Sequence, residues 1–247
     1  VDSVSAVSYA THISYVLGKH EWKITNDFHC NKEQPDYTTQ LKLTGCREGE
    51  FTCDDGQCVR MEERCDQVAQ CRDESDEVNC RRLLLKSSYE KTIPPITTVS
   101  TSNFSVVPVP VKVSILLMKI IKMEEVEHKI DLKFQITLKW MENRATFYNL
   151  KDETSLNALE QNYIKQLWLP DVVYDNTDQI ESTKLGDWKT SITITREGNF
   201  TRAGKEEVDE AEIFQGAENG LTMQQTYTHN FQCEYMLHRY PFDTQAS

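Results

Sequence analysis

The sequence has no run of about 18 apolar residues, the length that a helix needs to cross the apolar core of a bilayer. The nearest approach is residues 106–121, where Pro108, Pro110, Lys112 and Lys119 interrupt the run. The first residues also lack the charged and apolar regions of a signal peptide. We therefore expect no membrane-spanning segment in these 247 residues, and we expect them to be a fragment that has lost both ends of a longer chain.

Basic residues are scarce: 27 Lys and Arg stand against 39 Asp and Glu, so the formal net charge is −12 at pH 7. This excess of negative charge argues against nucleic acid and anionic lipid surfaces as direct partners. The sequence also lacks a glycine-rich phosphate loop and a Ser, His and Asp arrangement typical of nucleophilic catalysis, and its six histidines are scattered. We therefore predict that the protein is not an enzyme.

Cysteine is rare outside residues 46–80: the rest of the chain has only Cys30 and Cys233. The other six cysteines lie within that stretch, which has neither a CxxC pair nor the mixture of Cys and His that zinc usually takes. Dense cysteines without such a pattern predict disulfides that formed in an oxidising compartment. Six cysteines allow 15 pairings, and the spacing alone leaves the pairing open.

The same stretch carries eleven Asp and Glu residues against four Arg. Thirty-five residues are too few to bury a core that offsets chain entropy, so this fold needs additional stabilisation. Three disulfides at about 2–4 kcal/mol each would supply one part. The carboxylates of Asp66, Asp73, Asp76 and Glu77 predict a second part, a bound calcium ion.

The regions on either side differ in pattern. Residues 1–45 are too short to hold a core alone, so we interpret them as the tail of an upstream extracellular domain in which the partner of Cys30 is missing. Residues 81–96 have no sustained period and predict a linker. Two N-x-S/T sequons, at Asn103 and Asn199, predict N-glycosylation of an extracellular protein.

Apolar and polar residues alternate along much of the second half of the chain. In residues 130–140 six apolar side chains alternate with five polar ones, which predicts a long, half-buried strand. Residues 227–237 repeat the alternation, whereas the acidic run over residues 206–212 predicts a solvated loop. Several strands with few helices predict a mainly β fold, either a sandwich or a barrel.

Residues 46–80 closely resemble the low-density-lipoprotein receptor class A repeat, on the motifs Cys46-x-x-x-Glu50-Phe51-x-Cys53, Asp55-Gly56-x-Cys58-Val59, Arg64-Cys65-Asp66 and Cys71-x-Asp73-x-Ser75-Asp76-Glu77-x-x-Cys80. The resemblance implies three disulfides: Cys46–Cys58, Cys53–Cys71 and Cys65–Cys80. It also implies a calcium ion held by the side chains of Asp66, Gln70, Asp76 and Glu77 and by the carbonyls of Glu63 and Val68.

Two residues depart from the pattern of that repeat. Gln70 stands where the family usually has a fourth acidic ligand, which predicts a weakened calcium affinity because one formal charge is gone. Glu63 stands where an aromatic residue often helps to hold a lysine of a partner, which weakens the case for lysine recognition.

Three further motifs follow in order: Trp140-x-Glu142-x-Arg144, Trp168-x-Pro170-Asp171 and Cys233-x6-Tyr240-Pro241-Phe242-Asp243. Together they resemble the extracellular ligand-binding domain of Cys-loop, or pentameric ligand-gated, ion channels. The resemblance implies an immunoglobulin-like twisted β-sandwich over residues 97–247, incomplete at its C-terminal end, that assembles as a pentamer and binds transmitter between subunits. It further implies a turn that transmits gating, formed by Tyr240, Pro241, Phe242 and Asp243.

The positions that would form a transmitter site also depart from the family. Gln135, five residues before Trp140, and Asp175, seven after Trp168, occupy positions that are often aromatic, so a cation–π site for a choline-like ligand is less expected. With Thr137 they are the candidate transmitter residues. The family's signature disulfide would need a cysteine at Ser247, so the resemblance predicts Cys233 to be a free thiol or to pair elsewhere.

These patterns favour the extracellular part of a ligand-gated channel subunit with an accessory calcium-binding class A module, on the outer side of the cell membrane. The expected partners are other subunits, a small-molecule transmitter, the membrane through segments outside this sequence, and a protein that the repeat could bind. The alternatives are a soluble transmitter-binding protein and the ectodomain of an adhesion or endocytic receptor without a pore. The transmitter and the ion selectivity are not encoded in these residues.

Overall fold

The computed structural model describes residues 5–7, 16–25, 36–99, 105–177, 190–202 and 210–233. Several predicted features lie outside the described residues, namely Cys30, Asn103, Ser247 and the turn of Tyr240, Pro241, Phe242 and Asp243. The chain divides into two compact units. The first is Val1–Arg82 together with Phe200–Phe214, and the second is Leu83–Asn199 together with Gln215–Ser247.

The first unit contains a three-stranded antiparallel sheet and a cysteine-rich module. The sheet has the order β1-β2-β3, formed by β1 (Ser5–Val7), β2 (Gly18–Thr25) and β3 (Asp36–Leu43). The module has the antiparallel pair β4 (Glu50–Thr52) and β5 (Cys58–Arg60) and two single-turn 3-10 helices, η1 (Met61–Glu63) and η2 (Ser75–Glu77). The antiparallel pair β13 (Phe200–Arg202) and β14 (Glu212–Gln215) comes from much later in the chain.

The module has a small core of its own. Its buried apolar residues come from β4, from the β5–η1 segment and from two disulfide partners; they are Phe51, Cys53, Val59, Met61 and Cys71. Two cations lie over the Phe51 ring, with Lys42 Nζ 4.3 Å and the Arg64 guanidinium carbon 4.4 Å from its centre. Cations at this distance are attracted to the ring face. A core of this size shows why the module needs covalent stabilisation.

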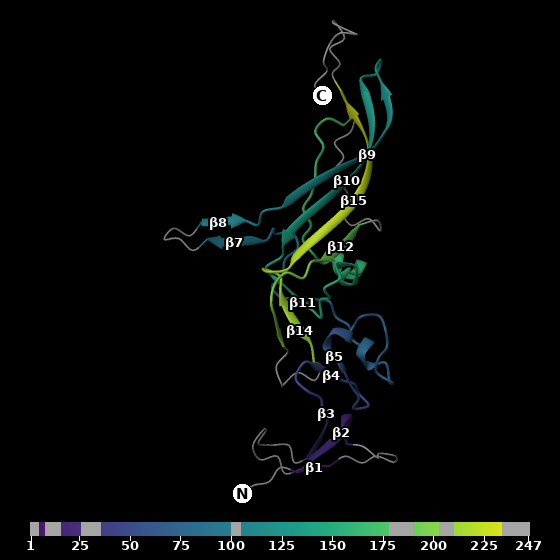
Figure 1. Ribbon diagram of the computed structural model, residues 1–247. Coiled ribbons are helices and arrows are strands. Elements are labelled where there is room, and N and C mark those ends of the chain that lie inside the picture. The colour runs from purple at the N-terminus through teal and green to yellow at the C-terminus, as the bar shows by residue number, and fades with distance from the viewer. Residues whose placement is uncertain are drawn as a thin grey trace. The chain divides into compact units, whose positions relative to one another are not determined.

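A four-stranded antiparallel sheet dominates the second unit, in the order β12-β15-β10-β9 (Figure 1). Its strands are β9 (Lys112–Glu124), β10 (Lys129–Met141), β12 (Ser191–Ile194) and β15 (Gly220–Gln232). The register of β10 with β15 is unbroken from Lys129↔Gln232 to Met141↔Gly220, whereas its register with β9 shifts twice.

The period-two pattern of residues 130–140 corresponds to β10. Its even-numbered side chains from Phe134 to Trp140 are buried, and the odd-numbered ones between them are half-buried or exposed. Residues 227–232 of the second alternating stretch lie in β15. The mainly β fold predicted from the sequence is confirmed, with a disulfide-rich module followed by a β-sandwich domain.

Smaller elements complete the second unit. β6 (Leu83–Leu85) pairs with β11 (Ala145–Tyr148), and β7 (Ile96–Val99) pairs with β8 (Ser105–Pro108). The helices are η3 (Thr154–Asn157) and the short α1 (Gln161–Ile164). β6 lies inside the stretch expected to be a linker. Its pairing with β11 buries Leu83, which has 3% of its surface exposed.

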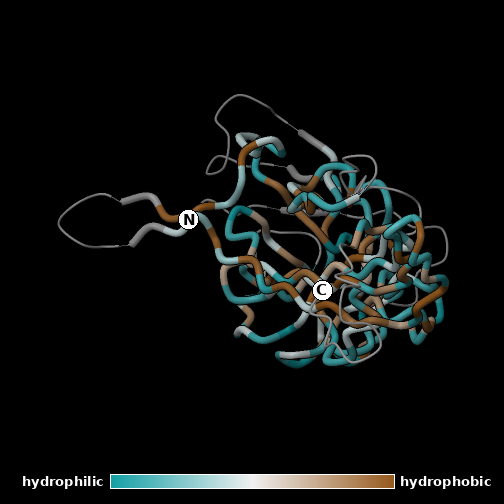
Figure 2. The backbone as a smooth tube through the Cα atoms, turned by 90° about the horizontal axis from the view of Figure 1, so that it is seen from above, coloured by the Kyte–Doolittle hydropathy of each residue, from teal (hydrophilic) through white to brown (hydrophobic). Residues whose placement is uncertain are grey.

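Apolar and polar residues are interspersed along the backbone (Figure 2). Among the residues that the structure describes, no helix has the length and hydropathy required to span a membrane.

Candidate calcium centre and ligand-binding face

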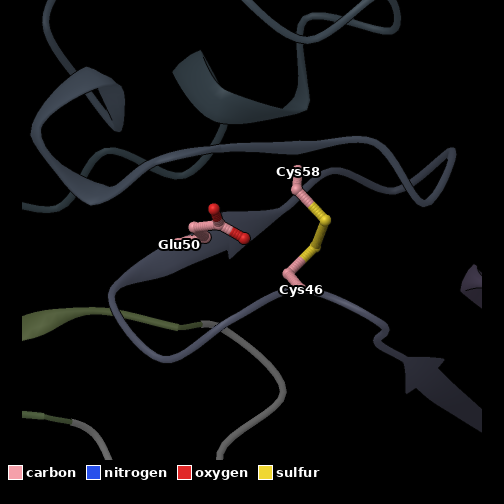
Figure 3. Close-up of side chains that lie close together, drawn as sticks. All are labelled: Cys46, Glu50 and Cys58. Carbon is pink, nitrogen blue, oxygen red and sulfur yellow. A yellow bond between two sulfur atoms is a disulfide. The ribbon is translucent and has the colours of Figure 1, made fainter.

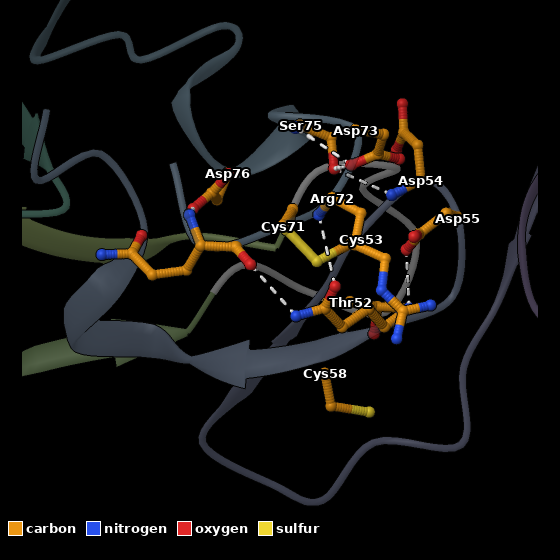
Figure 4. Close-up of a disulfide and its surroundings, with 12 residues drawn as sticks. Thr52, Cys53, Asp54, Asp55, Cys58, Cys71, Arg72, Asp73, Ser75 and Asp76 are labelled. Atoms are coloured by element: carbon orange, nitrogen blue, oxygen red, sulfur yellow. Dashed lines mark hydrogen bonds between the residues drawn. A yellow bond between two sulfur atoms is a disulfide. The ribbon is translucent and has the colours of Figure 1, made fainter. Parts of the chain in front are cut away.

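Three disulfides hold the cysteine-rich module together. They join Cys46 to Cys58 (Figure 3), Cys53 to Cys71 (Figure 4) and Cys65 to Cys80. Glu50 lies beside the first disulfide and Asp73 beside the second, in groupings that could suggest a metal site. The sulfur atoms of both groupings are consumed in disulfides, so these groupings are not thiolate metal centres.

The predicted calcium ligands are joined to one another by hydrogen bonds. The Gln70 amide nitrogen Nε2 donates to Asp66 Oδ2 at 3.1 Å, and the Gln70 backbone N–H donates to Asp76 Oδ2 at 2.6 Å. Backbone N–H groups of Asp66 and Gln67 donate to the two carboxylate oxygens of Glu77, at 2.8 and 3.0 Å. The structure therefore brings these four residues into one network.

Two oxygens in this network fit a bound cation. Asp76 is fully buried, and its Oδ1 has no hydrogen-bond donor within the described structure. Gln70 Oε1 is buried in the same way. A buried carboxylate oxygen without a donor is costly unless a cation compensates for its charge. Because the side-chain donors are oxygen atoms and three of the four groups are acidic, the site fits a hard cation such as calcium.

Glu63 and Val68, whose carbonyls are the other expected ligands, lie at η1 and in the loop after Asp66. The Val68 backbone N–H donates to Asp66 Oδ1 at 2.9 Å, so this bond holds the Val68 backbone close to the Asp66 carboxylate. The Glu63 side chain accepts two hydrogen bonds from the Arg60 guanidinium. These bonds lower the pKa of the Glu63 carboxyl below its usual range.

Arg64 and Asp73 support the segment that carries Asp76. The buried Arg64 guanidinium donates to the carbonyl of Ser75 at 2.9 Å and to that of Asp76. Asp73 accepts from the N–H and hydroxyl of Ser75, whose Oγ accepts from the Asp54 N–H (Figure 4). Burial opposes ionisation of Asp73, but the bonds from Ser75 outweigh it and hold its pKa below the usual range. Arg64 belongs to the class A motif, but nothing in the sequence predicted this supporting role.

The Trp140-x-Glu142-x-Arg144 motif forms an ion pair in the second unit between a fully buried carboxylate and a partly exposed guanidinium. Glu142 is fully buried, and its two carboxylate oxygens accept from Arg144 Nε at 2.7 Å and Nη2 at 2.8 Å. Arg144 Nη1 also donates to the carbonyl of Ile93 at 2.8 Å. The Trp140 and Trp168 rings meet edge to face, with their centres 6.3 Å apart. These contacts give the motif residues a structural role.

Tyr89 completes this network, although nothing in its local sequence indicated a role. Its hydroxyl donates to Glu142 Oε2 at 3.1 Å and accepts from the Trp168 N–H at 2.8 Å. The Arg144 guanidinium lies 4.5 Å from the centre of its ring. Burial raises the pKa of the Tyr89 phenol to about 12. The residue links the start of the second unit to both tryptophan motifs.

The transmitter-site candidates Gln135 and Thr137 share one face of β10. Both are half-buried, and their neighbours in register on β15 are Thr226 and Gln224. Asp175 is exposed in the segment after Trp168, and within the described residues no hydrogen bond joins it to the other two. The structure therefore places Gln135 and Thr137 together on a polar face of β10. Asp175 lies in a different segment, outside the strand.

An aromatic cluster lies on the opposite face of β10. Phe134 is centred 5.9 Å from Tyr174, and Tyr174 is centred 4.8 Å from His229. Tyr227 and Phe231 of β15 complete the cluster. Burial raises the pKa of the Tyr174 phenol. This tyrosine, one residue before Asp175, was not among the predicted site residues. Its ring contacts with aromatic side chains of β10 and β15 indicate a role in core packing.

Comparison with known families assigns both parts of the chain. Residues 44–80 match the low-density lipoprotein receptor domain class A, and residues 79–246 match the neurotransmitter-gated ion-channel ligand binding domain. The second match covers about two thirds of the chain. The chain belongs to the neurotransmitter-gated ion-channel ligand-binding family. The ligand-binding domain is thus the larger part of the chain, and the class A repeat precedes it, as both resemblances predicted.

Individual relatives are similar over shorter stretches. The vitellogenin receptor of Solenopsis invicta is 40% identical over 53 residues, which are 21% of this chain and 3% of that receptor. The suppressor of tumorigenicity 14 protein homolog of Bos taurus is 35% identical over 72 residues. The match covers 27% of this chain and 8% of the length of that protein. The chain thus spans only a small share of these relatives. Both matched families are non-enzymatic domains.

Proposed function

We propose that the chain is the extracellular part of a pentameric ligand-gated channel subunit, located on the outer side of the cell membrane. The observation that carries this proposal is the family match over the ligand-binding domain. The membrane would be reached through segments outside these residues. Asn199 is exposed, which is compatible with a glycan on an extracellular surface.

Strand β9 supports the assembly of subunits. Along it, eight large apolar side chains are exposed by 47% to 64%: Val113, Ile115, Leu116, Leu117, Met118, Ile120, Ile121 and Met123. Soluble monomers rarely expose so many contiguous apolar residues, and such surfaces usually mark contacts with other chains. We assign this strand to contacts with a neighbouring subunit.

The polar face of β10 and β15 is the proposed transmitter-contacting surface, with Gln135 and Thr137 at its centre and Asp175 as a further contact. Amide, hydroxyl and carboxylate groups recognise a ligand by hydrogen bonds. Because Gln135 and Asp175 are not aromatic, we propose that recognition does not depend on a cation–π cage formed by this chain.

The class A repeat is proposed to bind calcium through Asp66, Gln70, Asp76 and Glu77, with the carbonyls of Glu63 and Val68. Bound calcium would neutralise the buried charge of Asp76 and fix the loop that precedes η2. Repeats of this class typically bind calcium, and the buried oxygen atoms without donors support the assignment.

Ligand binding by the whole 247-residue chain tests the proposal. A panel of small amine and amino-acid transmitters is titrated calorimetrically, and one of them should bind saturably. Gln135→Ala and Thr137→Ala should weaken that binding about tenfold each, as expected for lost hydrogen bonds in a partly desolvated site. Thr146→Ala on β11 is the matched control. Binding that neither site variant changes would contradict the assignment of this face.

A receptor ectodomain without a pore is the second candidate, because part of the chain is similar to a protein named as a receptor for vitellogenin. In that case deletion of the repeat, rather than change of Gln135 or Thr137, would abolish ligand capture. The larger extent of the ligand-binding match favours the channel proposal.

A further inference from the structure

Residues 200–214 lie, by sequence, within the ligand-binding match, yet they form part of the compact unit that contains the class A repeat. We refer to them as the β13–β14 segment. An acidic, solvated loop was expected over residues 206–212. Of those residues the structure describes 210–212, and two of them have defined roles: Glu212 begins β14, and Glu210 binds the repeat.

Glu210 binds Thr52 through both of its carboxylate oxygens. The Thr52 backbone N–H donates to Oε2 at 2.8 Å, and the Thr52 hydroxyl donates to Oε1 at 2.9 Å. Thr52 is fully buried, and its hydroxyl also lies 2.6 Å from that of Thr44. Hydrogen bonds to a carboxylate are stronger than those between neutral groups. The contact joins residues 158 positions apart.

The position of Thr52 on its strand explains why this bond matters. In an antiparallel pair, successive backbone N–H groups point alternately toward and away from the partner strand. The Cys53 N–H donates to the carbonyl of Gln57, across the β4–β5 pair, so the Thr52 N–H points away from β5. A buried strand-edge N–H requires an acceptor from elsewhere, and Glu210 supplies it.

A second ion pair fixes the direction of the segment. Arg202 Nη1 lies 2.7 Å from Glu48 Oε1, just before β4. The side chains are 42% and 90% exposed, so this pair contributes little free energy of folding. It nevertheless pairs a cation of β13 with an anion of the repeat, while Glu210 binds the neighbouring strand end.

We infer that the class A repeat binds the β13–β14 segment of its own chain, with the exposed edge of β4 as the docking surface and Glu210 as the anchor. The expected protein partner of the repeat is thus, at this edge, a segment that lies within the ligand-binding match by sequence. The inference concerns the repeat and does not depend on which transmitter the domain binds.

Hydrogen exchange of the whole chain, resolved at single amides by NMR, tests this inference. The Thr52 amide should exchange slowly in the native protein and about tenfold or more faster in Glu210→Ala, because its acceptor is lost. Glu210→Gln, which retains one acceptor oxygen, should give an intermediate rate. Glu125→Ala removes the same charge from the exposed β9–β10 turn and should leave the rate unchanged.

A charge swap gives an independent measurement if Glu210→Ala perturbs folding. Arg202→Glu alone, which places two anions together, should speed exchange of the β14 amides about two- to fivefold, and the added Glu48→Arg should restore it. The number of intact disulfides, determined by mass spectrometry, serves as the folding control.

Two results would overturn the inference. One is an unchanged Thr52 exchange rate in Glu210→Ala with all three disulfides intact. The other is protection of Thr52 that disappears on dilution, which would assign Glu210 to a second copy of the chain.

Discussion

At the scale of single residues, Tyr89 shows how one hydroxyl can connect separate motifs. It bonds the buried carboxylate of Glu142 and the backbone of Trp168, and its ring receives the Arg144 guanidinium. Glu142 is fully buried and already accepts from Arg144, so the phenol provides a further donor for a buried charge. Removal of one partner from a buried network leaves the remaining groups without compensation.

Tyr89→Phe is therefore expected to lower the free energy of unfolding of the ligand-binding domain by about 1–3 kcal/mol, because the Trp168 N–H loses its acceptor and Glu142 loses a donor. Urea unfolding monitored by tryptophan fluorescence measures the change. Tyr163→Phe is the control, since that tyrosine is half-buried in α1. Equal stabilities of Tyr89→Phe and the native chain would contradict the network.

The raised pKa of Tyr89 also predicts an alkaline limit of stability. The phenol ionises near pH 10 in the unfolded chain and at about 12 in the folded domain, so the folded state prefers the protonated form. Its contribution is complete below pH 10 and is lost as the pH rises toward 12. Unfolding measured from pH 9 to 12 should show this loss in the native chain, and Tyr89→Phe should show a shallower decline.

Gln70→Glu should strengthen calcium binding, because it restores a fourth carboxylate to a site with three. We expect a gain of about tenfold in affinity by calorimetry. Without calcium the same variant should be less stable, since Gln70 Nε2 now donates to Asp66 and a carboxylate there would repel it. Gln67→Glu, in the same loop, is the control, and an affinity equal in both variants would argue against Gln70 as a ligand.

The sequence predicted some of these residues because their signals are local. Spacing and cysteine density identify residues 46–80, and period-two alternation identifies the two faces of β10, including Gln135 and Thr137. Tyr89 lies in a stretch without periodicity, so only the folded chain reveals its partners. The bond from Glu210 to Thr52 joins distant positions through polar groups that have no pattern, and the acidic run around Glu210 indicated only solvation.

At the scale of elements, β9 and β10 differ although both are thirteen residues long. β10 lies between two strands and buries one face, whereas β9 is the edge of its sheet and is exposed along nearly its whole length. Edge strands with apolar side chains tend to pair with other chains unless charge or shape prevents it. The charged residues of this strand are Lys112, Lys119, Lys122 and, at its end, Glu124.

Ile115→Glu combined with Leu117→Glu should therefore weaken self-association of the chain, by about tenfold or more, since charges replace two exposed apolar side chains of the strand. Sedimentation velocity over a range of concentrations measures the change. Val126→Glu, in the turn after β9 and 94% exposed, is the control. Identical association of all three proteins would argue against β9 as the subunit contact.

At the scale of the whole molecule, the chain passes between its two compact units three times, after Arg82, before Phe200 and after Phe214. The class A repeat and the ligand-binding domain are therefore successive in sequence but not separable by one boundary. A deletion that ends at residue 80 would remove Thr52 and Glu48 and leave Glu210 and Arg202 without their partners.

This chain path has a consequence for shedding of the repeat by proteases. Arg81 is exposed directly after Cys80, the last cysteine of the repeat, and would be a natural cleavage site for trypsin-like enzymes. A single nick there should not release residues 1–81, because the β13–β14 segment would retain them without a covalent link. Size-exclusion chromatography should find both fragments together after the nick, and Glu210→Ala should let them separate. A chain cleaved in this way would keep its class A repeat and lose it only when the contact with Glu210 is weakened.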